Sequence, residues 1–456
     1  TMRQILSIVI LVFTVLFLVE SKSTTGPRVL VLLDNEDDKK LYTKFFGYLE
    51  GRDYILTYKT ASDSGSSVGL FSYGERVFDH LINFAQKTDK IDDIAPISLT
   101  NFVNDGGNIL LAISSKVNEN IQNFARELDI EFDEQDTLVI DHFNYNISDD
   151  GKHTLLVSNN VVNNEAILSK EVIEGPPVLF RGIGHKIGSV PLLTKIMWAD
   201  NNAYSYETKD DQVVEQEPLA IGNNIGLISA LQARNNARVT IVGSLEFFSD
   251  RFFDSPVQKF NSPESYPKSG NEAFVRDLTK WTLQEKGVLH VTSRFHHKDD
   301  EFEQLEIYRI KDNFTYTIGI SEYADDHWRA FNGNDVQLEL IMLDPYIRVN
   351  LTALPTTKEH QDNHVRKYKA HVQLPDVYGV FTLKVNYKRP GYTYIVDTTT
   401  ITIRHFRHNE YPRFISAAYP YYTGAASMGI GFLLFCFIWI FNKDGGKTTA
   451  EKKKIN

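Results

Sequence analysis

The sequence predicts an α/β domain with an open, mostly parallel layered sheet, followed by a β-sandwich-like domain and one transmembrane helix. Residues 28–34 (RVLVLLD) form a near-continuous apolar run, which is typical of a strand buried on both faces of a parallel sheet. After Gly287 the helical periodicity fades, and short alternating segments take over. Residues 421–441 contain no charge, and these 21 positions give a helix of about 31 Å, close to the bilayer core of about 30 Å.

Residues 1–22 are typical of a secretory signal peptide. A basic start at Arg3 precedes an uncharged apolar run at 5–19, and cleavage is expected near the small residues Ser21 and Ser23. The 15 residues of this run give a helix of only about 22 Å, which is shorter than a bilayer core. This length disfavours the alternative, a retained membrane anchor.

Residues 27–286 are predicted to form the α/β region, with a division into two subdomains near 135–175. Strands alternate with helices along this region, which favours right-handed crossovers and an open sheet. One helix is predicted from Val77, Leu81 and Phe84, which recur at helical spacing. The other expected elements are helices around 41–49, before Gly106 and at 271–284, and strands at 54–58, 109–113, 137–140 and 239–242.

Residues 287–410 are predicted to form the β-sandwich-like domain. Its alternating segments lie at 314–320, 336–343, 381–387 and 398–403. In the third segment Phe381, Leu383 and Val385 face one side, and the polar residues between them face the other. Pro390 and Gly391 then indicate a turn.

The transmembrane helix is predicted at 418–441, with a tail at 442–456. Five lysines and two acidic residues give the tail a net charge of +3, which places it in the cytosol. The rest of the chain then carries −14, so nucleic acid is not an expected partner. The one cysteine, Cys436, lies inside the predicted span, so no disulfide is expected outside it.

Lys453 and Lys454 lie next to the carboxyl terminus and resemble a dilysine signal for retrieval to the endoplasmic reticulum. Such a signal needs two cations at a fixed distance from a free carboxylate on an exposed tail. The alternative is that both lysines only complete the positive flank of the membrane segment.

No catalytic or cofactor-binding residue is predicted. The glycines at 182–188 (GIGHKIG) have one residue too many for a dinucleotide fingerprint, and Pro191 follows where a phosphate-facing helix should continue. Ser244 comes directly after a predicted strand but lacks the Gly-x-Ser-x-Gly pattern of a nucleophile elbow. Catalysis is therefore the weaker hypothesis.

No metal site is predicted either. His296 and His297 are adjacent, so in a strand they would face opposite sides and could not easily share one ion. The remaining candidates lack a recognised ligand spacing; they are Asp141, His142, Asp150 and His153.

Two further sets of residues indicate modification and helix packing. Asn-x-Ser/Thr sequons, and hence candidate N-glycosylation sites, begin at Asn146, Asn313 and Asn350. Small residues four positions apart in the membrane segment would let another helix approach closely, although small residues are frequent in spans in any case. The two pairs are Ala425 with Gly429, and Ser427 with Gly431.

Several long stretches resemble one family, that of the 48 kDa, non-catalytic subunit of the oligosaccharyltransferase complex. The resemblance runs from about Arg28 through the membrane segment. Its motifs are 32–35 (LLDN), 231–239 (LQARNNARV), 243–253 (GSLEFFSDRFF), 374–381 (LPDVYGVF) and 418–422 (AYPYY).

The resemblance implies a scaffolding role without a cofactor, in the membrane of the endoplasmic reticulum, with the bulk of the chain in the lumen. It implies three kinds of partner: a polytopic catalytic subunit, ribophorin-type subunits and small membrane subunits. Two alternatives remain open from the residues. One is a lumenal binding protein or cargo receptor of the early secretory pathway, and the other is an enzyme with an amidotransferase-like α/β site.

Overall fold

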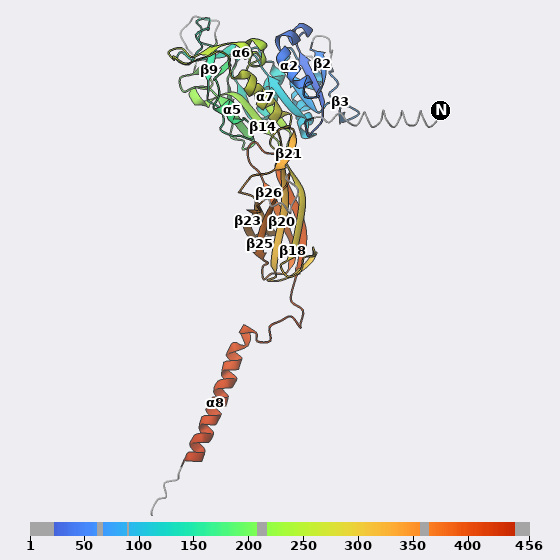
Figure 1. Ribbon diagram of the computed structural model, residues 1–456, viewed down its shortest axis with the longest axis vertical. Coiled ribbons are helices and arrows are strands. Elements are labelled where there is room, and N and C mark those ends of the chain that lie inside the picture. Colours follow the sequence, from blue (N-terminus) through green and yellow to red (C-terminus); the bar gives the residue numbers. More distant parts are fainter. Residues whose placement is uncertain (1–21, 62–66, 89–90, 208–216, 356–363, 443–456) are drawn as a thin grey trace, which may run out of the picture.

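The computed structural model describes residues 22–61, 67–88, 91–207, 217–355 and 364–442. Residues 1–21 of the predicted signal peptide, and the tail with Lys453 and Lys454, lie outside these ranges. Along the longest axis, an α/β domain is followed by a narrower all-β domain and then by the helix α8 (Figure 1).

The α/β domain is built on a nine-stranded sheet. The first five strands in spatial order pair in parallel, while the remaining pairings are antiparallel. Parallel pairing is thus confined to one half of the sheet. The strands in spatial order are β2 (Ile55–Thr60), β1 (Arg28–Leu33), β5 (His80–Asn83), β6 (Asn108–Ala112), β15 (Arg238–Val242), β14 (Ile225–Gln232), β11 (His185–Ile187) and β7 (Ile130–Phe132), with β12 (Leu193–Trp198) also paired to β14.

Helices cover both faces of this sheet. On β1, Val29 and Val31 belong to one hydrophobic cluster, and Leu30 belongs to a second cluster on the opposite face. A strand buried on both faces needs apolar residues at every position, which explains the continuous run in the sequence. The first face is covered by α2 (Thr43–Glu50), α6 (Asp250–Asp254) and α7 (Asn271–Thr282), and the second by α3 (Pro96–Asn104) and α4 (Glu119–Glu127).

The helix predicted from Val77, Leu81 and Phe84 is wrong. The chain forms the strand β5 there, and all four of its residues are buried. The helical spacing of the three apolar residues is a coincidence, because Ile82 between them is also fully buried and β5 pairs on both sides, with β1 and β6.

Short elements complete the α/β domain. A short helix, α5 (Lys170–Ile173), and four small two-stranded sheets lie outside the main sheet. Their pairs are β3 (Phe71–Ser72) with β4 (Glu75–Arg76), β8 (Thr137–Ile140) with β13 (Tyr204–Glu207), β9 (Leu156–Ser158) with β10 (Val178–Phe180), and β16 (Val257–Gln258) with β17 (Ser265–Tyr266).

The all-β domain consists of two five-stranded sheets that share one hydrophobic core. On β26 the apolar side chains Phe381, Leu383 and Val385 are buried in this core, as their alternation predicts. The first sheet contains β18 (Val288–Lys298), β20 (Asn313–Ala324), β21 (His327–Ala330), β24 (Thr352–Ala353) and β25 (Arg366–Gln373). The second contains β19 (Ile307–Arg309), β22 (Gln337–Met342), β23 (Asp344–Asn350), β26 (Gly379–Tyr387) and β27 (Ile395–Arg404).

The last described helix, α8 (Tyr419–Phe441), is the one candidate membrane span among the described residues. With the preceding short turn it covers Ser416–Phe441 at a mean hydropathy of 2.1, and none of its most apolar window is buried inside the protein. An apolar helix of this length without protein around it is suited to a lipid environment. The predicted single C-terminal membrane helix is therefore matched by one helix of suitable length and composition.

Candidate functional site

Ser244 and the glycines at 182–188, whose sequence context resembles that of enzyme motifs, have structural roles. Ser244 is 1% exposed, and its Oγ donates a hydrogen bond to the main-chain O of Arg181 at 2.5 Å while accepting one from Phe247 N at 3.3 Å. A Cβ on Gly182 would overlap the carbonyl O of Gly243, so that glycine allows two main chains to approach closely. Neither position is arranged as a nucleophile or a phosphate loop.

The candidate metal ligands make other contacts, although the structure brings two of them together: the rings of His142 and His153 lie 4.9 Å apart. Asp141 accepts hydrogen bonds from Phe143 N at 2.8 Å and from both nitrogens of Asn144. His142 Nε2 lies 3.0 Å from the hydroxyl of Tyr204. Across the described ranges, no group of three or more His, Cys, Asp or Glu side chains is placed to hold a metal ion.

A pocket of about 790 Å³ with a mixed polar and apolar lining opens at the carboxyl ends of the parallel strands. The chain runs from β1 to β2 on one side and returns to β5 on the other, and this switch point is where open α/β sheets bind ligands. Asp34 Oδ1 accepts hydrogen bonds from the main-chain N of Gln86 and of Lys87, both at 2.9 Å. Burial raises the pKa of Tyr42, which keeps its hydroxyl protonated. The residues lining the pocket could hold a polar ligand, but they include no paired nucleophile and base.

Where the α/β domain meets the all-β domain (Figure 1), a polar cluster links β15 to the loop between β26 and β27. At its centre is Arg238 on β15, which is fully buried. Its guanidinium donates hydrogen bonds to four main-chain oxygens: Trp281 at 2.6 Å, Lys286 at 2.7 Å, Gly287 at 2.9 Å and Gly391 at 3.4 Å. It also lies 4.5 Å from the centroid of the Trp281 ring. Burial lowers the pKa of Arg238 to about 9, so the group remains a cation at neutral pH.

The loop between β26 and β27 supplies the other side of this cluster. Trp281 Nε1 donates to Gly391 O at 2.8 Å, and Gln232 Nε2 donates to Tyr392 O at 2.7 Å. Asn236 Oδ1 accepts a hydrogen bond from Tyr394 N at 2.6 Å. Gly391 has a φ of 89°, a backbone conformation that favours glycine, and a Cβ there would lie only 3.0 Å from that of Ala166.

A second polar contact joins the two domains through Arg52, which precedes β2. Its guanidinium pairs with Glu285, at the end of the α/β domain, and with Asp326 in the turn between β20 and β21. Tyr54 donates its hydroxyl proton to the same Glu285. We call these two contacts together the domain junction. Sequence reasoning missed it, although Arg238 lies inside the 231–239 motif and directly precedes the mainly apolar run 239–242.

The three sequons differ in accessibility. Asn146 is only 2% exposed; its Nδ2 donates to Ser148 Oγ at 2.8 Å, and its Oδ1 accepts from Gln258 N at 3.0 Å. Asn313 and Asn350 are exposed and stand at strand ends. A glycan therefore fits the folded surface at Asn313 and Asn350 but not at Asn146.

The four predicted helix-packing residues of α8 are all exposed in the structure. At about 100° per residue, Ala425 and Gly429 lie on one side of the helix, and Ser427 and Gly431 lie about 200° away. The Ser427 hydroxyl donates to Gly424 O at 2.8 Å, so its polar group is satisfied within the helix. The two pairs therefore present two separate packing faces.

Over the described residues, the fold and the junction together define a class: a protein with one candidate membrane helix and two further domains joined to each other by buried polar contacts. Comparison with known families then identifies the chain. The model for the N-terminal domain of OST48 matches residues 20–285, and the model for the OST48 middle domain matches residues 296–443. The chain belongs to the OST48 family, and the resemblance seen in its motifs is confirmed.

Three curated relatives carry the name dolichyl-diphosphooligosaccharide–protein glycosyltransferase 48 kDa subunit. The Drosophila melanogaster protein is 39% identical over 439 residues, covering 94% of this chain and 95% of the relative. The Arabidopsis thaliana protein is 39% identical over 423 residues (92% and 94%), and the Danio rerio protein is 39% identical over 426 residues (92% and 93%).

Among solved structures, a ThuA-like protein from Parabacteroides merdae aligns with 57% of this chain and 91% of its own at 12% identity. Its TM-score of 0.28 is too low to support any conclusion about fold or function.

Proposed function

We propose that this chain is a non-catalytic scaffolding subunit of the oligosaccharyltransferase complex. That complex transfers a preassembled glycan from a dolichol-linked donor to asparagine in the sequons of nascent proteins. In this proposal the two extramembrane domains lie in the lumen of the endoplasmic reticulum, and the tail lies in the cytosol. The names of the curated relatives support membership of the complex.

The domain junction is the observation that carries the scaffolding role. Arg238 and Arg52 both use their charged groups to hold one domain against the other, at 0% and 8% exposure. Burying two guanidinium groups is costly, and the Nε of each has no hydrogen-bond partner among the described residues, so the hydrogen bonds and ion pairs of the terminal nitrogens favour one fixed orientation. A fixed orientation is what a subunit needs if each of its domains is to contact a different partner.

The membrane helix would supply a second point of assembly. Its two packing faces, Ala425 with Gly429 and Ser427 with Gly431, suit two different neighbouring helices. We assign these neighbours to the polytopic catalytic subunit and to ribophorin-type or small membrane subunits. Gly429→Leu should reduce co-purification of one neighbour, and Gly431→Leu should reduce co-purification of the other. The volume-conserving control Ile430→Leu should reduce neither.

The proposal is tested by purifying the full chain from membranes in a mild detergent and identifying what co-purifies. We expect a polytopic subunit in stoichiometric amount, and we expect depletion of the chain to cause hypoglycosylation of many client proteins. Recovery of the chain as a lone species, with normal client glycosylation after depletion, would contradict the proposal. Glycan transfer by the purified chain alone would contradict the non-catalytic role.

A lumenal binding protein or cargo receptor is the second candidate, and the switch-point pocket of about 790 Å³ is the observation that favours it. A receptor of this kind would cycle between compartments by means of its tail. Replacing Lys453 and Lys454 with serine should then move the protein out of the endoplasmic reticulum. Unchanged localisation of the serine variant would show that complex membership, and not retrieval, retains it.

A further inference from the structure

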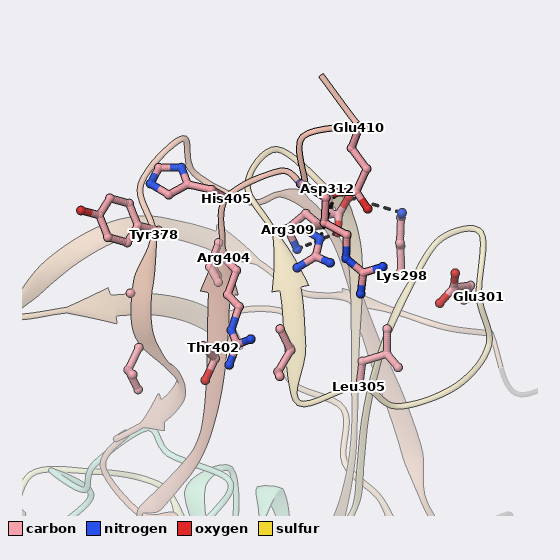
Figure 2. A pocket seen from close by; sticks show the side chains of 15 residues that line it. Lys298, Glu301, Leu305, Arg309, Asp312, Tyr378, Thr402, Arg404, His405 and Glu410 are labelled. Carbon is pink, nitrogen blue, oxygen red and sulfur yellow. Dashed lines mark hydrogen bonds and ion pairs between the residues drawn. The ribbon is translucent and has the colours of Figure 1, made fainter. Parts of the chain in front are cut away.

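A second pocket lies at the end of the all-β domain from which the chain continues to α8 (Figure 2). Its volume is about 950 Å³. Its floor is the outer face of β19, β26 and β27, because Tyr308 and Ile403 on these strands point into the core at 1% exposure each. Arg309 and Arg404, next to them in sequence, therefore face the pocket (Figure 2).

The lining is cationic in an acidic chain. Four of the lining side chains are Lys or Arg and three are Asp or Glu, so the pocket carries one net positive charge while the chain carries −11. Lys298 pairs with Asp312 at 3.4 Å, and Arg309 Nε pairs with Glu410 at 3.2 Å. Asp312 and Glu410, two of the three acidic residues in the lining, therefore already have a basic partner. Among the described residues, no acidic side chain forms an ion pair with Arg404 or Arg407.

The ion pair of Arg309 with Glu410 also determines how far the pocket can lie from the membrane. Glu410 is held at the pocket rim, and only residues 411–418 connect it to Tyr419, where α8 begins. Eight residues span at most about 28 Å when extended. Tyr411 within this connection is 45% exposed, and tyrosine side chains favour the membrane interface, which supports a short distance between the pocket and the bilayer surface.

We propose that this pocket binds the phosphate of an anionic phospholipid headgroup at the bilayer surface, with Arg404 and Arg407 as the contacting cations. Guanidinium groups donate paired hydrogen bonds that match phosphate oxygens. The short connection to α8 favours a lipid over an acidic segment of another protein, because headgroups are present wherever the helix is inserted. The site does not depend on membership of a complex.

The experiment uses the full chain reconstituted in nanodiscs of phosphatidylcholine, with or without a photoreactive phosphatidylinositol. Crosslinked peptides are mapped by mass spectrometry. We expect labelling of peptides that contain residues 298–312 or 402–410. Arg404→Gln should lower that labelling roughly fivefold, and Arg404→Gln with Arg407→Gln should lower it further, as expected for cations near a charged membrane surface. Lys384→Gln is the matched control, since Lys384 lies on β26, four residues beyond Val380 of the pocket.

Three results would overturn the proposal. Labelling that the double variant leaves unchanged would show that these arginines do not bind the lipid. Loss of labelling on adding millimolar inorganic phosphate would indicate a site for free anions. Unchanged labelling together with reduced co-purification of other proteins would indicate a protein-docking site. Because both arginines are exposed, an unchanged melting temperature is expected for each variant and serves as the folding control.

Discussion

Replacing Arg238 is the most direct test of the domain junction. In Arg238→Met the side-chain volume is nearly kept, but all four hydrogen bonds to main-chain oxygens are lost. Three of those oxygens keep another donor: Trp281 O accepts from Gln284 N at 3.1 Å, Gly287 O from Thr393 N at 2.9 Å, and Gly391 O from Trp281 Nε1 at 2.8 Å. Lys286 O alone is left without a second donor among the described residues.

These contacts determine the size of the effect. One buried acceptor left without a partner costs about 1–3 kcal/mol, and removing the buried charge offsets part of the lost hydrogen bonding. We therefore expect Arg238→Met to lower the free energy of unfolding by about 1–3 kcal/mol. Arg238→Ala also loses the packing against the Trp281 ring, at 4.5 Å, and should cost about 3–5 kcal/mol.

The assay is thermal unfolding of the full chain in detergent, combined with limited trypsin digestion after Lys286. Loss of the junction should lower the melting temperature by a few degrees and speed cleavage between the two domains. Arg234→Met is the control, because Arg234 lies in the same hairpin and is exposed. Wild-type stability and an equally protected Lys286 in both Arg238 variants would refute the reasoning.

Two further predictions concern the buried side chain of His80 and the three sequons. Burial lowers the pKa of His80 from 6.5 to about 4. Between these two pH values the unfolded chain binds a proton at this side chain that the folded chain does not bind. The free energy of unfolding should therefore fall by about 3 kcal/mol as the pH drops from 6.5 to 4. A pH-dependent unfolding series checks this, and His80→Gln should flatten the profile; an unchanged slope would contradict it. For the sequons, Asn313→Gln and Asn350→Gln should each increase electrophoretic mobility by the amount expected for the loss of one glycan, whereas Asn146→Gln should leave the mobility unchanged. A glycan mapped to Asn146 would show that modification precedes folding there.

Local patterns in the sequence were sufficient for several elements. The apolar run of β1, the alternation of Phe381, Leu383 and Val385, and the uncharged stretch of α8 each reflect how a single element is buried, so they can be recognised without knowing its neighbours. The incorrect prediction of a helix at β5 also arose from a local pattern of apolar residues. Of the three apolar residues at helical spacing only Leu81 lies in β5, while Val77 precedes the strand and Phe84 follows it, and the pairing of β5 with β1 and β6 identifies the strand.

The sequence by itself therefore determined the broad class, the family through its motifs, and the membrane segment. The tertiary structure decided how the domains are joined and which sequons are accessible. The junction brings Trp281 beside Gly391, which is 110 positions away, and Arg238 lies 153 positions from the same glycine. Such contacts depend on how two folded surfaces meet, and no local periodicity records that geometry. The same holds for Asn146, whose burial is due to the strand region near Gln258, 112 positions along the chain.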